Sequence, residues 1–417
     1  MLGGSSAYVV SVRQETERSR MPNGRKKIVV MAPHDDGFGA FSILARLACA
    51  LKENNSELRF VFVSGTRGNK SLEEFGLSDV ARIVQWDNLI TLPKDPDAGG
   101  VDVTKLAKDL SQKLPQADAW LNLRSKLNWE DVELAISMGV PWLHGVASEV
   151  RVPSVEVGDM CWSIVLRKIL ESGTCLTPAL EALLHSVASY EHKATEAWLL
   201  PFAAPNDYVA HFSESAVPVN WIPGVFGTQD PSELPHQQTI KGLLQAQLSR
   251  RAHVGIHSGF TPVWEKVMDE LRGLPSGSTG DPAFTTMNNA TKQIEVLEQG
   301  GGTFPVPPIS SLIPLHATQD LGITRGGITV LDHIAARCPL AIAEEPHHWL
   351  SDRQRSAALA AGLCLPLDLG TFRTGPRQIT AGLLAQTNGL RNIKQRMAAV
   401  PIGAEVPLAE HLVKRFL

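Results

Sequence analysis

The chain has 417 residues, of which 43% are hydrophobic and 20% are charged, and its formal net charge at pH 7 is −4. This length exceeds one ordinary hydrophobic core and predicts two domains, while the composition excludes disorder over most of the chain. The small negative charge, without a compensating block of basic residues, excludes a general nucleic-acid-binding protein.

The cysteines and the N-terminal segment both favour a cytoplasmic protein. The five cysteines show no metal-binding CxxC spacing, and most lie in apolar runs, as reduced core thiols do; they are Cys49, Cys161, Cys175, Cys338 and Cys364. Residues 1–26 lack the apolar segment of a signal peptide and are expected to form a flexible leader. Because no apolar stretch is as long as a membrane-spanning helix, we expect no transmembrane segment.

The first predicted domain covers residues 27–227 and opens with a strand, a glycine-containing loop and a helix. Lys27–Pro33 is a β-branched run, the loop HDDGFG follows at 34–39, and leucines then recur at helical spacing. This order is typical of a doubly wound α/β domain. The Gly-x-Gly of the loop lacks the spacing of a dinucleotide fingerprint, and no suitable acid follows the second expected strand, Leu58–Ser64.

The middle of this domain continues the alternation of strands and helices. We expect a strand at 117–123, a helix at 132–138 and a strand at 140–145. His144 would then lie at a strand end facing a crevice, with a solvated or core histidine as the alternative. Residues 228–250 are expected to form a linker and the first helix of the second half, because the start of this stretch is rich in Pro, Asp, Gln and Ser.

The second predicted domain, residues 251–400, begins with the same order of strand, loop and helix as the first. A strand at 253–256 is followed by a loop of small residues and a helix at 263–271. Residues 273–289, rich in Gly, Ser, Pro and Thr, are expected to form a surface loop. An amphipathic helix is expected within 401–417.

The segment from Leu321 to Gly362 carries the strongest functional pattern of the sequence. Gly326 and Gly327 directly precede a helical pattern, so the loop can present several backbone N–H groups at a helix N-terminus, where anions bind. Thr329 adds a hydroxyl in the first turn. Asp332, on the same face one turn later, can accept hydrogen bonds from a sugar diol.

A second polar cluster follows the apolar run Cys338–Ala343, which we expect to be a buried strand. Glu344, Glu345, Pro346, His347 and His348 come directly after it, and Asp352 to Gln354 open the next expected helix. Ligands of open α/β sheets bind outside the carboxyl ends of the strands. Both polar clusters are therefore expected to line one crevice.

These residues in this order resemble the donor-binding region of nucleotide-sugar glycosyltransferases of the GT-B fold. The resemblance is strongest to the peptidoglycan N-acetylglucosaminyltransferases, and the shared elements are Arg325, Gly326, Thr329, Asp332 and Asp352 to Gln354. It implies an α/β protein in which two Rossmann-like doubly wound domains face a cleft, with residues 27–227 as the acceptor domain and 251–400 as the nucleotide-sugar domain. A final helix that crosses back onto the first domain also fits the GT-B pattern.

The resemblance implies a role for each donor-binding residue. The loop at 325–327 and Thr329 would contact the diphosphate, Asp332 the ribose hydroxyls, and Asp352 with Gln354 the transferred sugar. The family usually has Glu at the ribose position, so either the shorter Asp332 contacts it differently or Glu344 or Glu345 takes part. The complete expected donor-binding set is Ser258, Gly259, Arg325, Gly326, Gly327, Thr329, Asp332, Glu345, His347, Asp352 and Gln354.

Transfer with inversion requires a general base for the acceptor hydroxyl. His34, Asp35 and Asp36 follow the first strand, at the mouth of the first domain, and we rank Asp36 before His34 and Asp35. Asp followed by Gly is also ordinary turn chemistry. GT-B enzymes often have a histidine where this chain has Ala40, so a role carried over from that histidine is in doubt.

No metal or other cofactor is expected to take part. No Asp-x-Asp stands at a strand end of the second domain, and the spacing of Glu345, His347 and His348 is not that of a zinc site. The nucleotide sugar would serve as co-substrate.

The sequence therefore predicts a metal-independent glycosyltransferase that uses a UDP- or TDP-sugar and a hydroxyl acceptor, either a small molecule or lipid-linked. A nucleotide-sugar hydrolase or epimerase and a non-catalytic nucleotide-sugar-binding partner protein are the alternatives. The sugar, the acceptor, the anomeric outcome and the oligomeric state are left open.

Overall fold

The structure is a computed structural model of the chain. It describes residues 27–34, 38–65, 69–86, 93, 102, 104–106, 108, 118–158, 161–171, 178–201, 205–227, 234–248, 251–257, 262–278, 280–288, 293–305, 312–344 and 349–417.

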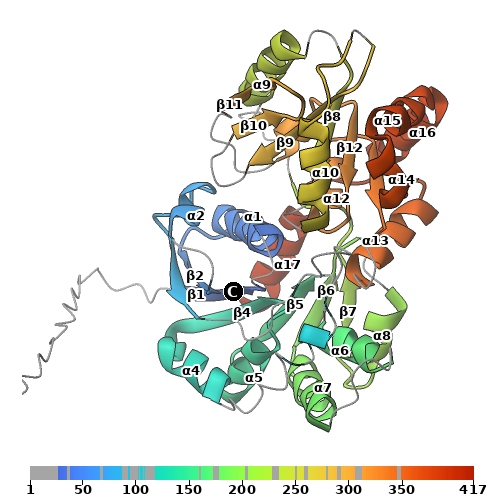
Figure 1. Cartoon of the computed structure of the whole chain (residues 1–417). Coiled ribbons are helices and arrows are strands. Elements are labelled where there is room, and N and C mark those ends of the chain that lie inside the picture. The colour runs from blue at the N-terminus through green and yellow to red at the C-terminus, as the bar shows by residue number, and fades with distance from the viewer. Residues whose placement is uncertain are drawn as a thin grey trace, which may run out of the picture.

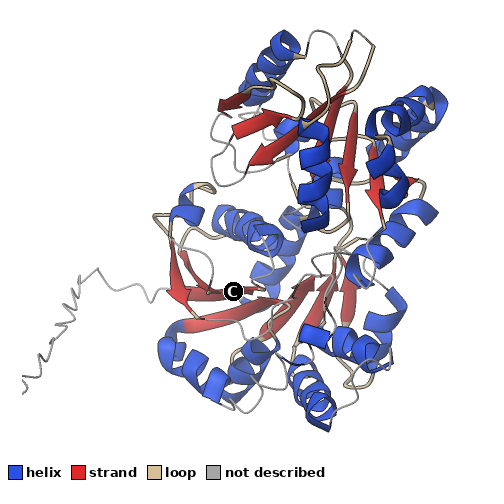
Figure 2. Cartoon of the chain, viewed as in Figure 1, coloured by secondary structure: helices blue, strands red, loops and turns tan. Residues whose placement is uncertain are grey.

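The described residues form two seven-stranded sheets (Figure 1, Figure 2). The first has the order β3-β2-β1-β4-β5-β6-β7, and every neighbouring pair in it is parallel. Its strands are β1 Lys27–Pro33, β2 Leu58–Ser64, β3 Ala81–Gln85, β4 Val132–Met138, β5 Ser154–Gly158, β6 Glu196–Leu199 and β7 Val219–Trp221.

The second sheet has the order β11-β10-β9-β8-β12-β13-β14. Strands β9, β8, β12, β13 and β14 are parallel, whereas β10 and β11 add an antiparallel edge. Its strands are β8 His253–His257, β9 Ala283–Asn288, β10 Gln293–Val296, β11 Thr303–Pro305, β12 Leu321–Thr324, β13 Leu340–Ala343 and β14 Leu365–Leu367. Two parallel sheets covered by helices confirm the predicted fold class.

Helices cover both sheets because parallel strands must be buried on both faces. Around the first sheet lie α1 Phe38–Asn54, α2 Lys70–Glu73, α4 Asp118–Lys126, α5 Pro141–Glu149, α6 Trp162–Glu171, α7 Pro178–Glu191 and α8 Pro205–Ser213, with a 3₁₀ turn η1 at Trp129–Asp131. The remaining helices are α9 Leu234–Gln247, α10 Pro262–Arg272, α11 Ile313–His316, α12 Ile328–Ala335, α13 Trp349–Ala360, α14 Leu369–Thr374, α15 Pro376–Ala385, α16 Thr387–Ala398 and α17 Glu405–Phe416. No helix within these described ranges is long and apolar enough to cross a membrane.

The strand order places one switch point in each sheet. In the first sheet, β1 lies between β2 and β4, so the chain leaves β1 in one direction and later returns to its other side. In the second sheet, β8 lies in the same way between β9 and β12. Open α/β sheets bind ligands at such points, outside the carboxyl ends of the strands.

Two local expectations are wrong. Residues 118–126 are helical, 132–138 form β4 and 141–149 form α5, which inverts the expected order of strands and helices in this stretch. The large apolar residues of β4 alternate with Glu133, Ala135 and Ser137, which is the pattern of a strand, so the expected helix assigned the wrong period to this segment. Part of the expected loop at 273–289 is strand β9, which pairs with β8.

The C-terminal helix α17 returns to the first sheet and packs against α1 (Figure 1). Four polar contacts hold it. The backbone N–H of Gly227 donates to the Glu405 carboxylate at 3.1 Å, the buried Glu196 carboxylate lies 3.0 Å from both His411 and Arg415, and Lys27 donates to the carbonyl of Leu417. The end of the chain therefore stabilises the first half of the molecule.

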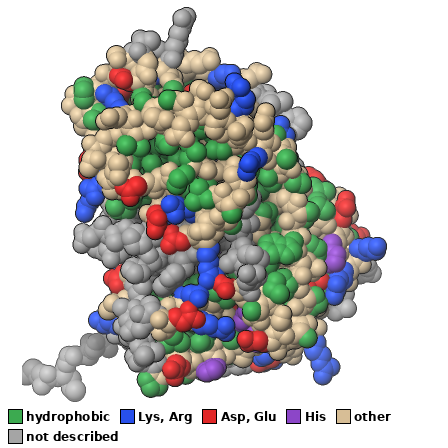
Figure 3. All heavy atoms as spheres, turned by 90° about the vertical axis from the view of Figure 1, so that its right-hand side faces the viewer, with side chains coloured by type: hydrophobic (Ala, Val, Ile, Leu, Met, Phe, Trp, Pro, Cys, Tyr) green, Lys and Arg blue, Asp and Glu red, His purple; other side chains and the backbone are tan. Residues whose placement is uncertain are grey.

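The surface carries mixed charge. On the face shown in Figure 3, Lys and Arg side chains are interspersed with Asp and Glu among the described residues. This distribution agrees with the small net charge of −4.

We expect Leu412→Ala to lower the free energy of unfolding by about 2–5 kcal/mol, the usual cost of a cavity in a packed core. Leu412 is 0% exposed and belongs to the core shared by α1 and α17. Val406→Ala is the matched control, because Val406 lies on the same helix but is 36% exposed. Urea unfolding followed by fluorescence measures both; equal midpoints for the two variants would show that α17 does not contribute to the core.

Candidate functional site

Two glycines shape the loop between β12 and α12. Gly326 has φ 120° and Gly327 has φ 82°, values that side-chain-bearing residues rarely adopt. They let the chain turn sharply from the buried Thr324 into α12. The N–H of Val330 donates to the carbonyl of Gly327 at 3.0 Å, and no side chain caps the helix start. The sharp turn expected before the helix is therefore present, and anion binding there stays a prediction.

The start of α13 meets this loop. The backbone N–H of Gly327 donates to Oε1 of Gln354 at 2.7 Å, and Gln354 is 3% exposed. Two elements of the predicted donor site are thus in direct contact. An anion that takes the N–H of Gly327 must displace Gln354 from it.

Asp332 lies in a buried ion pair between the two halves of the chain. Its Oδ1 is 3.1 Å from both Nη1 and Nη2 of Arg46 on α1, and the two side chains are 11% and 10% exposed. Burial raises the pKa of Asp332, and the Arg46 guanidinium opposes that shift. Nothing in the sequence pattern indicated Arg46, which lies on an ordinary amphipathic helix. The ribose contact expected of Asp332 stays a prediction.

The first turns of α1 and α12 touch each other. A Cβ added to Gly39 would lie 2.7 Å from Cδ1 of Ile328, so glycine permits this approach. Because α1 follows β1 and α12 follows β12, the contact brings the carboxyl ends of the two sheets together. This is the edge at which the sequence predicted a cleft between the domains.

His34 lies at the switch point of the first sheet. It directly follows β1, its backbone N–H donates to the carbonyl of Met138 in β4 at 2.9 Å, and its side chain is half-buried. Ala40, at the position where GT-B enzymes often have histidine, is 1% exposed.

The other predicted site residues fall into two groups. Arg325, Thr329 and Asp352 are half-buried at the β12–α12 and α13 elements described above. Outside the described residues lie Asp35, Asp36, Ser258, Gly259, Glu345 and His347. Their expected contacts stay predictions.

His144 does not face the cleft. It lies inside α5 with 0% exposure, where Nε2 is 2.8 Å from Oε2 of Glu156 and Nδ1 is 2.9 Å from Oγ of Ser154. Burial raises the pKa of Glu156, and the contact with His144 opposes that shift. The alternative of a core histidine is therefore correct.

Two further ion pairs near the cleft were not predicted. Arg353 of α13 pairs with Asp207 of α8, which links the two halves of the chain a second time. Arg355 pairs with Glu344 at 3.2 Å, beside the end of β13. Long-range pairs of this kind leave no local signal in a sequence.

Three groups of side chains among the described residues could hold a metal ion. They are His257 with His316 and His333, Cys161 with Glu191 and His211, and His192 with His211 and Glu214. In the second and third groups, His211 already lies 2.9 Å from Glu191.

Neither a protein-family model nor a curated protein matches this sequence. Solved structures do match its fold. The glycotransferase of kitacinnamycin has a TM-score of 0.57 at 11% identity, covering 94% of this chain and 99% of that one. UGT2 of Phytolacca americana, complexed with UDP-2fluoro-glucose and pterostilbene, has a TM-score of 0.58 at 11% identity, covering 94% and 100%. The spinosyn forosaminyltransferase SpnP has a TM-score of 0.55 at 16% identity, covering 93% and 99%.

This is the GT-B fold. In GT-B terms, β1 with His34 belongs to the first domain and the β12–α12 loop to the second, and Gly39 against Ile328 marks where their switch points meet. The finer resemblance to the peptidoglycan N-acetylglucosaminyltransferases stays a prediction.

We expect Asp332→Asn to lower the free energy of unfolding by about 3–5 kcal/mol, because it leaves the buried Arg46 guanidinium without its charged partner. Urea unfolding measures the loss. The double variant Asp332→Asn with Arg46→Met should lose less free energy of unfolding than the two single variants together, as expected for groups in contact.

Asp79→Asn is the control, because Asp79 pairs with Lys52 at the surface, where its side chain is 66% exposed. This variant should have the same urea midpoint as the wild type. If Asp332→Asn behaves like Asp79→Asn, the pair does not hold α1 to α12.

Proposed function

We propose that the protein is a glycosyltransferase that moves a sugar from a UDP- or TDP-sugar to a hydroxyl acceptor in the cleft between its two domains. The observation that carries this proposal is the meeting of the two switch points, with the glycine loop at 326–327 opening α12 on one side and His34 ending β1 on the other. The full-length match to GT-B structures supports it.

The donor side is suited to a nucleoside diphosphate. A leaving diphosphate gains charge in the transition state, and fixed N–H groups, hydroxyls and a guanidinium stabilise that charge. In the proposed site, the first-turn amides of α12, Thr329 and Arg325 supply these groups. The bound UDP-2fluoro-glucose of the Phytolacca UGT2 supports uridine as the base. We propose that the diphosphate is bound without a metal ion, as the lack of an Asp-x-Asp in the second half indicates.

The acceptor side would supply the general base. His34 is the described candidate, and Asp35 with Asp36 are the other two. A base must come within hydrogen-bonding distance of the acceptor hydroxyl, and the switch point of the first sheet lies opposite the donor loop. The pterostilbene in the Phytolacca UGT2 structure supports a small-molecule acceptor.

A non-catalytic nucleotide-sugar-binding protein is the second candidate, and Ala40 is the observation that favours it. This buried alanine stands where GT-B enzymes often carry a histidine. Such a protein would bind a nucleotide sugar without turnover.

We expect UDP or TDP compounds to raise the midpoint of thermal unfolding. A ligand at about one hundred times its dissociation constant stabilises the folded state by roughly 2.7 kcal/mol. Arg325→Ala and Thr329→Val should abolish the shift, whereas Arg391→Ala, which removes an exposed guanidinium from α16, should keep it. No shift with any nucleotide would contradict both the enzyme and the binding protein.

We expect substitution of the general base to lower turnover about 10²–10⁴-fold while nucleotide binding is kept, because the base lies on the opposite wall from the diphosphate. His34→Ala, Asp35→Asn and Asp36→Asn are compared by following UDP release and the glycosylated product. His185→Ala, at an exposed position of α7, is the control.

The product separates the alternatives for catalysis. Free sugar would indicate a hydrolase and an altered nucleotide sugar an epimerase. Binding without any product would support the non-catalytic protein.

A further inference from the structure

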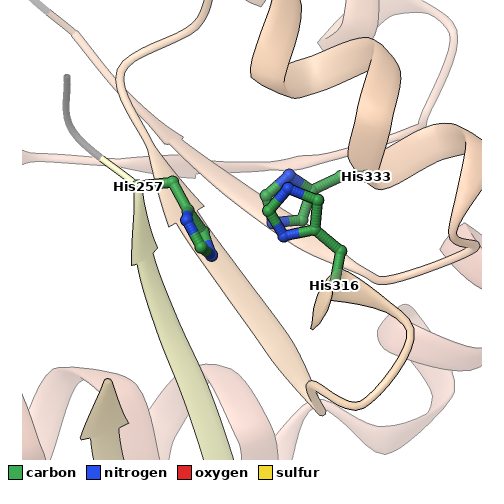
Figure 4. A group of neighbouring side chains, drawn as sticks. All are labelled: His257, His316 and His333. Carbon is green, nitrogen blue, oxygen red and sulfur yellow. The ribbon is translucent and has the colours of Figure 1, made fainter. Parts of the chain in front are cut away.

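Three histidines from distant parts of the sequence converge in the second half of the chain (Figure 4). His257 is the last residue of β8, His316 the last residue of α11, and His333 lies in α12. One ring nitrogen from each lies within 4.8 Å of the other two. The rings of His316 and His333 stack with centroids 3.8 Å apart, and that of His257 stands 4.4 Å from His316 at 89°.

The sheet makes room for this cluster. A Cβ added to Gly322 of β12 would lie 2.0 Å from Nε2 of His333, and one added to Gly255 of β8 would lie 2.1 Å from Nε2 of Gln319. Even an alanine at either position would displace these polar side chains. Two neighbouring strands thus present bare backbone beneath His333 and Gln319.

The hydrogen bonds of the cluster leave lone pairs unused on two of the three rings, whereas Nε2 of His257 accepts from the side-chain amide of Gln319 at 2.9 Å. His333 donates from Nδ1 to the carbonyl of Thr329 at 2.8 Å, and His316 from Nδ1 to Oε1 of Gln319 at 3.3 Å. In both rings the unprotonated nitrogen is then Nε2. Both Nε2 atoms are buried and have no hydrogen-bond partner among the described residues.

This pattern is that of metal-binding histidines. A ligating imidazole usually donates its other N–H to a carbonyl or an amide oxygen, which fixes the tautomer and orients the ring. Buried polar atoms in a protein are otherwise hydrogen-bonded, so two unpartnered acceptors in one place require an explanation.

The charge state also suits a metal. Burial lowers the pKa of His333 to about 4, and burial with the neighbouring rings lowers the pKa of His257 and His316 well below the usual value. Each shift favours the neutral ring, which is the form that binds metals.

We propose that His257, His316 and His333 bind a divalent transition-metal ion, with Zn²⁺ as the expected ion. Imidazole nitrogen favours such ions, whereas Mg²⁺ and Ca²⁺ prefer oxygen. Tetrahedral Zn²⁺ with Zn–N bonds of 2.0–2.1 Å places its ligand nitrogens about 3.3 Å apart. Because the rings of His316 and His333 stack and their lone pairs lie in the ring planes, one of these rings must rotate to direct its nitrogen at a shared ion, and His257 must release the Gln319 amide. A water completes the set.

The ion has a structural role at the switch point of the second sheet. It joins the end of β8 to α11 and α12, and the carbonyl partner of His333 belongs to Thr329 in the first turn of α12. The bound ion would therefore hold the first turn of α12 in place, next to the loop of Gly326 and Gly327. The proposal does not depend on glycosyl transfer, and it is compatible with metal-free binding of the diphosphate.

The test begins with untagged wild-type protein dialysed against Zn²⁺ and then against metal-free buffer. We expect about one Zn²⁺ per chain by mass spectrometry of metals. The unfolding midpoint should be at least about 5 °C higher with Zn²⁺ than with a chelator. Co²⁺ in place of Zn²⁺ should give the visible absorption of a tetrahedral site with nitrogen ligands.

His316→Gln and His333→Gln should each lower the affinity for Zn²⁺ by more than the 10–100-fold that loss of a supporting hydrogen bond typically costs. His253→Gln is the matched control, because His253 is a buried histidine of β8 that is hydrogen-bonded to Thr285 and Thr318 instead. It should keep the metal.

Wild-type protein without bound metal, with the same midpoint in Zn²⁺ and in chelator, would overturn the proposal and leave three neutral rings that pack as a polar layer. Full metal content in both ligand variants would overturn the assigned ligands. If the variants do not fold, the Co²⁺ spectrum and the chelator comparison on the wild type decide whether the metal site exists. Nucleotide binding in metal-free protein would leave the proposed function intact whatever the metal result.

Discussion

The contact between α1 and α12 determines how the two sheets meet. Its polar part is the buried pair of Arg46 with Asp332, and its apolar part is a cluster that runs without interruption from α1 through α12 to α17. A buried guanidinium and carboxylate are costly to separate, because each would be left without a partner in a low-dielectric interior. The close approach of Gly39 to Ile328 follows from this packing. The relative position of the two sheets is therefore set by the core and not by the loops around it.

Because α12 packs against α1, it takes part in three features of the molecule. Its N-terminus follows the glycine loop expected to bind the diphosphate, its outer face pairs with α1, and its inner face carries His333 into the histidine cluster. An anion at the loop, the interdomain pair and a metal at the cluster would all act on the same eight-residue helix. The expected donor site, the interdomain pair and the proposed metal site thus share one short element.

The second interdomain pair, Arg353 with Asp207, lies on the adjacent helix α13. Gln354, the next residue, accepts the hydrogen bond of the Gly327 N–H. The polar start of α13 therefore faces both the glycine loop and the first half of the chain. Arg353, which stands between the two residues expected to contact the sugar, is thus the one that joins this helix to the first half of the chain.

The sequence by itself determined the two-sheet α/β architecture and the glycine loop before α12, because periodicity, turn chemistry and helix starts are local properties. The order of elements predicted at 117–145 was wrong although β4 alternates in the sequence, because short apolar segments fit both a strand and a helix period. Only the tertiary structure decided that Asp332 meets Arg46, 286 residues away, and that His144 is a core residue. It alone brought His257, His316 and His333 together, because ligands on three elements separated by long intervals leave no spacing in the chain. Side chains meet in such clusters through sheet order and helix packing, which no local pattern encodes.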